Sequence, residues 1–376
     1  MTMDYERTVT IRNRIIGGAY RRVLKPLFFA RDPERVHDLM TATGACMGRH
    51  AATRRLARVL FSYAHPSLEQ TMFGLRFVNP IGLAAGFDKN AELTDILPDV
   101  GFGFAEIGSV TGEPCEGNPK PRLWRLPASQ SLLVYYGLKN DGCEAIAARL
   151  TGRRFRIPVG ISVAKTNSTA TVETAAGIAD YVKAFRTVHD VAGYVTVNIS
   201  CPNAFGGEPF TDPGKLDLLL AAIDRLAPTK PVFLKLPADL APGELDALLD
   251  VSTSHRVDGY ICSNLTKRRE NPRVIERDVP TKGGLSGKPT ELLANALISH
   301  CYRRLNGRAV IVGCGGVFTA EDAYEKIRLG ASLIQMITGM IYRGPQVVSE
   351  INQGLVRLLK RDGYTNVSQA VGAAHR

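Results

Sequence analysis

The sequence predicts a (β/α)₈ TIM barrel with a small N-terminal helical domain. Its length of 376 residues suits one barrel of about 250 residues plus an appendage. From residue 77 onward, short apolar runs rich in β-branched residues alternate with longer amphipathic stretches, and this alternation occurs eight times. The runs predicted as barrel strands are residues 77–83, 104–110, 158–163, 194–200, 232–236, 259–263, 310–314 and 333–337.

Helical patterns fill most of the gaps between these runs, as expected for a parallel barrel. A doubly wound open sheet is the alternative, but the Gly-rich first turn typical of that fold is missing from the sequence. The predicted helices include residues 177–191, 215–226, 242–249, 292–305 and 320–329.

Residues 1–65 form a basic segment that we separate from the barrel domain, residues 66–376. The segment holds twelve Arg and Lys residues against five acidic ones, which gives +7 of the chain's formal net charge of +11. It lacks the uninterrupted apolar stretch of a secretory signal and any run long enough to span a bilayer. One interpretation is a pair of amphipathic helices on an anionic membrane surface, and the other is a helical cap on the barrel with a solvated basic face.

Composition excludes several other classes of protein. The seven cysteines are scattered without a C-x-x-C pair, and no histidine cluster has metal-ligand spacing, so we expect reduced thiols and no metal. The positive charge comes without a nucleic-acid-binding motif, so no nucleic-acid partner is expected.

Polar residues follow the predicted strands, where a barrel places its active site. Any one of them could be an ordinary loop residue, but residues of this kind follow all eight strands. They are Lys89, Ser109, Thr111, Lys165, Asn198, Cys201, Asn203, Lys235 and Asn264, together with the glycines after the last two strands.

Those glycines predict a phosphate site. Backbone N–H groups can surround a phosphate only where no Cβ blocks its approach, and barrels often bind phosphate after strands seven and eight. Gly315 and Gly316 follow the seventh run, and Thr338 and Gly339 follow the eighth. The pattern indicates a phosphorylated cofactor or substrate.

Four segments resemble the quinone-linked class 2 dihydroorotate dehydrogenases, and the likeness extends from about residue 20 to the C-terminus. These are NPIGLAAGFDK (79–89), EIGSVT (106–111), GNPKPR (117–122) followed by Arg125, and GGLSGKP (283–289). The early Asp32-Pro33-Glu34 and the predicted helices around it resemble the N-terminal domain with which that class meets the membrane and admits quinone.

The resemblance implies FMN-dependent oxidation of dihydroorotate to orotate in pyrimidine biosynthesis, with a quinone as acceptor. Lys235 would lie near the N1/C2=O edge of the flavin, where a cation stabilises the reduced ring. Lys89, Asn198, Asn203 and Asn264 would bind orotate. The implied cofactor residues are Ala85, Lys89, Ser109, Asn198, Lys235, Ser263, Ser286, Gly287, Gly315, Gly316, Thr338 and Gly339.

The resemblance places the catalytic base at Cys201, between Asn198 and Asn203. Class 2 members normally carry serine there, and cysteine is typical of the soluble class 1. A free thiol has a pKa of about 8.5, so we expect cysteine to accept a proton near neutral pH more readily than serine.

Four further positions depart from the family pattern: Val134 and Leu265 stand where the family has substrate-binding Asn and Thr, and Ser162 and Ile337 replace a flavin-contacting Asn and a Tyr. They leave two alternatives open: a paralogous FMN oxidoreductase acting on another dihydro or unsaturated ring, and a non-catalytic flavin or membrane scaffold. We expect a monomer or homodimer bound peripherally to the cytoplasmic side of a membrane, which is the inner membrane if the source is bacterial.

Overall fold

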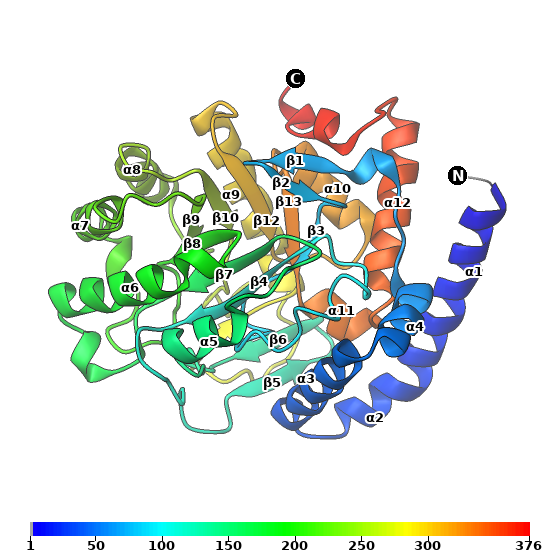
Figure 1. Ribbon diagram of the computed structural model, residues 1–376, viewed down its shortest axis with the longest axis horizontal. Helices are drawn as coiled ribbons and strands as arrows, with labels where there is room; N and C mark the ends of the chain where they lie inside the picture. The colour runs from blue at the N-terminus through cyan, green and yellow to red at the C-terminus, as the bar shows by residue number, and fades with distance from the viewer. Residues whose placement is uncertain (1–2) are drawn as a thin grey trace.

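A computed structural model describes residues 3–376, and its centre is a closed barrel of eight parallel strands (Figure 1). The strands follow one another around the barrel in chain order, and the last pairs with the first. The predicted barrel is therefore confirmed, and the open sheet is excluded. The strands are β3 (Ile81–Leu83), β4 (Phe104–Val110), β7 (Val159–Val163), β8 (Tyr194–Asn198), β9 (Val232–Leu236), β10 (Gly259–Cys262), β12 (Val310–Cys314) and β13 (Leu333–Met336).

One predicted strand, residues 77–83, is wrong as a single element. Phe77 ends β2, which pairs with β1 in a separate hairpin, and the barrel strand β3 begins only at Ile81. Pro80 has no N–H to donate, and the Asn79 side chain accepts from the N–H of Ile81 at 3.0 Å. The chain therefore turns between the two strands. The hairpin strands are β1 (Gln70–Met72) and β2 (Leu75–Phe77).

Helices cover the outside of the barrel, and the five predicted ones are confirmed to within a few residues at their ends. α7 shows the local reason: the Asp212 carboxylate accepts from the N–H of Lys215, and Pro213 occupies the first helical position. The α-helices between the barrel strands and after the last of them are α5 (Cys143–Leu150), α6 (Thr174–Val188), α7 (Pro213–Asp224), α8 (Pro242–Ser252), α9 (Glu291–Leu305), α10 (Ala320–Arg328), α11 (Thr338–Arg343) and α12 (Val347–Arg361). Short 3₁₀ turns are η2 (Pro66–Leu68), η3 (Thr169–Thr171), η4 (His189–Val191), η5 (Pro209–Thr211), η6 (Lys288–Thr290), η7 (Val367–Ala370) and η8 (Ala373–His375).

The N-terminal segment is helical and lies along one side of the barrel, with α1 beside α12 (Figure 1). Within residues 3–376, no helix is both long enough and apolar enough to cross a bilayer. The helices are α1 (Met3–Ala19), α2 (Lys25–Phe29), α3 (Pro33–Arg49) and α4 (Ala51–Phe61), with a π-turn η1 (Tyr20–Leu24) between the first two.

A small antiparallel sheet at the barrel mouth connects these helices to the barrel. Its strands are β5 (Leu123–Leu126), β6 (Ser131–Val134) and β11 (Gly284–Leu285), and α3 contacts β5. Arg122 and Glu34 form a buried salt bridge of 2.8 Å, and both side chains are 6% exposed. Although burial of Glu34 opposes ionisation, hydrogen bonding and charge from Arg122 hold the pKa of Glu34 below its usual range. This ion pair fixes the start of α3 against the mouth of the barrel.

Candidate active site

A large cavity lies at the C-terminal ends of the barrel strands, and all the residues predicted to bind cofactor or substrate line it. It continues past them to the N-terminal helices, where Phe28, Phe29, Val36 and Met40 form part of its wall. The predicted residues in the lining are Ala85, Lys89, Ser109, Asn198, Cys201, Asn203, Lys235, Ser263, Asn264, Ser286, Gly287, Gly315, Gly316, Thr338 and Gly339. The structure therefore brings together residues that are up to 254 positions apart (339 − 85).

The three asparagines are held in place by hydrogen bonds across the strand ends. The Asn198 side chain donates to Ser109 Oγ at 2.8 Å and accepts from Ser200. The Asn264 side chain in turn donates to the carbonyl of Ser200 at 2.7 Å. Asn203 donates to the carbonyl of Val134 at 2.9 Å, which ties the loop after β8 to β6. Their amides are thus positioned before any ligand binds.

Cys201 lies in the loop after β8, which ends at Asn198. Burial raises the pKa of its thiol to about 11, against the hydrogen bond from Asn203 and the charges of Lys165 and Lys235. Burial in this site therefore raises the pKa of the thiol above that of free cysteine, and the advantage of cysteine over serine as a base stays a prediction. The apolar environment disfavours the thiolate, so nearby cations decide how much of it forms.

Lys89 supplies a positive charge at one end of the site. Its Nζ lies 3.2 Å from His37 Nε2 and 4.2 Å from the centre of the Tyr136 ring. Burial lowers the pKa of Lys89 to about 8. An anionic group of a ligand would restore its charged form.

Lys235 supplies a second cation, from β9. It is buried, and within the described chain it forms no salt bridge. Its charge acts on Glu106 of β4, whose carboxylate accepts from Thr196 and Gln335 at 3.0 Å each. Burial outweighs these contacts and raises the pKa of Glu106. Lys235 is consequently free to meet a negative charge that develops in the cavity.

The glycine turn after β12 has free donors. In residues 3–376, the N–H groups of Gly315 and Gly316 donate to no protein acceptor, while the hydroxyls of Ser286 and Thr338 lie 2.8 Å apart at its edge. These features fit an anionic group such as a phosphate.

The two glycines are also required by the fold. Both have positive φ, +125° for Gly315 and +72° for Gly316, and a Cβ on Gly316 would lie 2.4 Å from Glu291 Cβ. The prediction considered only the approach of phosphate, but backbone conformation and packing demand glycine here as well.

Comparison with known proteins gives the family. Residues 67–359 match the family model described as dihydroorotate dehydrogenase. The chain belongs to this family. It is 41% identical over 354 residues to the dihydroorotate dehydrogenase (quinone) of Gloeobacter violaceus, covering 94% of this chain and 98% of that protein. It is 43% identical over 364 residues to the one from Anaeromyxobacter dehalogenans, covering 94% and 96%. The resemblance to the quinone-linked class is thereby confirmed.

A solved structure of the same family shows the same fold. The dihydroorotate dehydrogenase of Eimeria tenella in complex with ferulenol superposes with a TM-score of 0.80 at 30% identity. The match covers 92% of this chain and 96% of that one.

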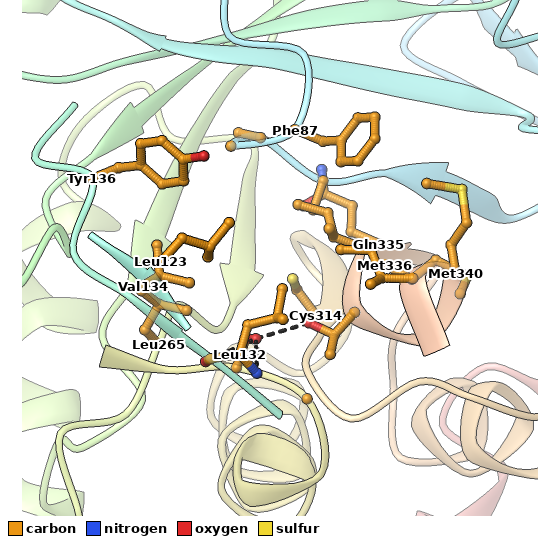
Figure 2. A pocket seen from close by; sticks show the side chains of 18 of the residues that line it. Phe87, Leu123, Leu132, Val134, Tyr136, Leu265, Cys314, Gln335, Met336 and Met340 are labelled. Carbon is orange, nitrogen blue, oxygen red and sulfur yellow. Dashed lines mark hydrogen bonds between the residues drawn. The ribbon is translucent and has the colours of Figure 1, made fainter. Parts of the chain in front are cut away.

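Two of the departures from the family pattern share one wall of the cavity, where Figure 2 shows Val134 and Leu265 close together. Val134 pairs with Gly284 across the small sheet, and a Cβ on Gly284 would lie 2.6 Å from Leu265 Cβ. This wall therefore offers ligands a hydrocarbon surface. Ile337 also lines the cavity, whereas Ser162 lies behind it and shares a hydrogen bond of 2.8 Å with Ser109.

The sequence interpretation missed His37 and Tyr136 as neighbours of Lys89. Tyr136 lies two residues after Val134, one of the departures from the family pattern, but nothing in the sequence placed it beside Lys89. His37 precedes Lys89 by 52 residues and belongs to α3, and no local pattern connects the two.

Proposed function

We propose that this protein is an FMN-dependent enzyme that oxidises dihydroorotate to orotate and passes the electrons to a quinone. The observation that carries the proposal is one continuous cavity, with two buried lysines, three asparagines and Cys201 at one end and apolar helix residues at the other. Dihydroorotate-dependent reduction of a short-chain quinone by the purified protein tests it. Without that activity, the paralogous oxidoreductase acting on another ring becomes the better account.

The site fits FMN. The free N–H groups of Gly315 and Gly316, with Thr338 and Gly339, would hold its phosphate, while Ser286 and Gly287 would add contacts. Lys235 would face the part of the ring that becomes negative on reduction. Ala85, Lys89, Ser109, Asn198 and Ser263 would line the ring itself. When bound, FMN supplies the acceptor for a hydride, which carries the two electrons of the oxidation.

The remaining residues would bind and deprotonate the substrate. Lys89 would bind the carboxylate, and Asn198, Asn203 and Asn264 would hydrogen-bond the ring. Oxidation of the C5–C6 bond requires a base to take the C5 proton as hydride leaves C6, and Cys201, which lines the cavity, would be that base. Each asparagine is already fixed by a protein partner, so little ordering is needed when the substrate binds.

The state of Lys89 predicts a pH dependence of substrate binding. A lysine is charged below its pKa, so its attraction for a carboxylate should weaken as pH rises through about 8. We expect KM for dihydroorotate to increase above that pH. Lys89→Met should raise KM at neutral pH and remove this dependence. Steady-state kinetics between about pH 6 and 9 measures both, and an unchanged pH profile in Lys89→Met would contradict the assignment.

The apolar wall predicts an unusual response to substitution. Val134→Asn adds a donor where the family normally has one, and one hydrogen bond contributes about 0.5–1.5 kcal/mol. KM for dihydroorotate should therefore fall by roughly two- to tenfold. The bond from Asn203 is to the backbone of Val134 and is retained. Val134→Ala, which changes size without adding a donor, is the control, and an equal effect of both variants would argue against a missing hydrogen bond.

Residues 1–65 would form the membrane-associated part of the enzyme. Exposed apolar side chains are frequent on its helices, including Ile15 at 65% and Val59 at 62%. Arg12 donates to the carbonyl of Val59 at 2.7 Å, so α1 and α4 lie side by side. With twelve basic residues in this segment, a peripheral site on an anionic leaflet, facing the cytoplasm, suits it. Quinone would then enter along Phe28, Phe29 and Met40.

Paired substitutions of these side chains test membrane binding. Full-length protein should float with anionic vesicles at low salt, and Ile15→Asp/Val59→Asp should reduce the bound fraction severalfold. Ile275→Asp is the matched control, because Ile275 is 63% exposed but lies outside the N-terminal helices. Added salt should weaken binding of the parent. If the parent does not bind such vesicles, the basic N-terminal helices are a cap on the barrel with a solvated face.

A further inference from the structure

Lys165 is a buried lysine to which the mechanism above gives no role. It follows β7, its side chain is 3% exposed, and within residues 3–376 it forms no salt bridge. Its Nζ donates to the carbonyl of Phe205 at 2.6 Å. A buried ammonium without a carboxylate partner is costly, so a compensating negative charge nearby would stabilise it.

Asn167, two residues after Lys165, forms hydrogen bonds that fix the loop containing Cys201. The Asn167 side chain accepts from the N–H of Phe205 at 2.7 Å. The carbonyl and the N–H of Phe205 are thus both hydrogen-bonded, to Lys165 and Asn167 respectively. Asn167 also donates to Asn118 at 3.0 Å, and Asn118 donates to the carbonyl of Asn203 at 3.0 Å. The position of the Cys201 loop is therefore set by the end of the neighbouring strand.

Three charged side chains act on the thiol of Cys201: Lys165, Lys235 and Glu208. β7 and β8 are neighbouring parallel strands, with Val163 opposite Val197, so Lys165 and Cys201 both follow this paired stretch. Lys235 approaches from β9, and both lysines favour the thiolate. Glu208, further along the loop, opposes it, but its carboxylate is engaged by Lys267 at 3.0 Å.

Lys165 in turn has few other charged neighbours. Burial lowers the pKa of Lys165, whereas the charges of Cys201 and of Asp180 on α6 favour its protonated form; the Asp180 carboxylate accepts from the N–H and hydroxyl of Thr166 at 2.6 and 2.8 Å. The hydroxyl of Tyr181, also on α6, donates to the carbonyl of Asn198 and remains neutral because burial raises its pKa far above 10. A thiolate at Cys201 would add a second negative charge beside that of Asp180.

We propose that Lys165 is a positioning residue that stabilises the thiolate of Cys201 and holds its loop over the substrate. This rests on the proposed role of Cys201 as the base. In the fraction of molecules that carry the thiolate, the ammonium would compensate its charge before the reaction. When the thiolate takes the C5 proton it becomes a neutral thiol, and Lys165 stays bound to the carbonyl of Phe205, so the loop keeps its place through the cycle.

Charge and tethering are separated by two substitutions in the holoenzyme. Lys165→Gln keeps a donor for the Phe205 carbonyl but removes the charge, and Lys165→Arg keeps both. The pH dependence of Cys201 alkylation by iodoacetamide, followed by peptide mapping, reports its thiolate directly and does not depend on which substrate the enzyme uses. Exposed Cys46 in α3 is an internal reference, and Lys183→Met, which removes a surface lysine of α6, is the control.

We expect Lys165→Gln to slow alkylation of Cys201 at neutral pH by about tenfold, which corresponds to an upward shift of about one pH unit in its midpoint. Lys165→Arg, Lys183→Met and the Cys46 reference should match the parent. Flavin reduction in Lys165→Gln should slow by the same factor at neutral pH and recover toward the parent value at high pH. A parent-like alkylation profile in Lys165→Gln overturns the proposal, because Lys165 then only tethers the loop. If the alkylation shift appears but dihydroorotate reduces no flavin even in the parent, the proposed substrate is wrong and the pairing stands.

Discussion

Cys201→Ala should slow reduction of the bound flavin by dihydroorotate by about 10²–10⁴-fold, the usual contribution of a positioned base. The variant should fold and bind FMN, because the side chain lines the cavity and alanine fills part of its place. Cys115→Ala, which removes a buried thiol outside that cavity, is the matched control. Stopped-flow mixing without oxygen measures the step, and a parent-like rate in Cys201→Ala would place the base elsewhere.

The pH profile of that step follows from the environment of Cys201. The base must be ionised before it takes a proton, and burial raises the pKa of Cys201 to about 11. The limiting rate should consequently rise with pH across the neutral range. Cys201→Ser should be intermediate in rate and need still more alkaline conditions, since a serine hydroxyl ionises less readily than a thiol.

Lys235→Met should slow flavin reduction by about 10²–10³-fold, the range seen when one preorganised donor to a developing negative charge is removed. FMN should remain bound through the glycine turn, and its midpoint potential should become more negative. Lys326→Met is the control, because Lys326 is a buried lysine on α10 outside the cavity.

Three measurements, one on the parent and two on Lys235→Met, separate the possible results. Denatured parent should release FMN, and release of another flavin or of none would contradict the cofactor assignment. A reductive titration gives the potential and stopped-flow gives the rate. An unchanged potential in Lys235→Met would mean that this cation does not face the reduced ring.

The fold was predictable because buried parallel strands leave a strong signal. Runs such as 194–200 and 232–236 are mostly apolar, and the strands they form are buried throughout, since helices cover one side of each strand and the barrel core the other. The residues after the strands then locate the site, because the C-terminal ends of all eight strands lie at the same end of the barrel. The break at Asn79-Pro80 could have been inferred from the proline.

Contacts between distant segments could not be predicted. His37 lies beside Lys89 because the Glu34 and Arg122 pair holds α3 against the barrel mouth; both segments resemble the family, but neither resemblance shows that these two residues pair. The pKa of Cys201 likewise depends on burial by the folded loop, which the value for a free thiol does not contain.

The central claim is tested most directly by mixing the purified holoenzyme with dihydroorotate in the absence of oxygen. We expect the yellow colour of the flavin to bleach as orotate forms, and the addition of a quinone to restore it. If dihydroorotate leaves the flavin oxidised while dithionite reduces it, the cofactor site is intact but the substrate is another ring, and the proposed function is wrong.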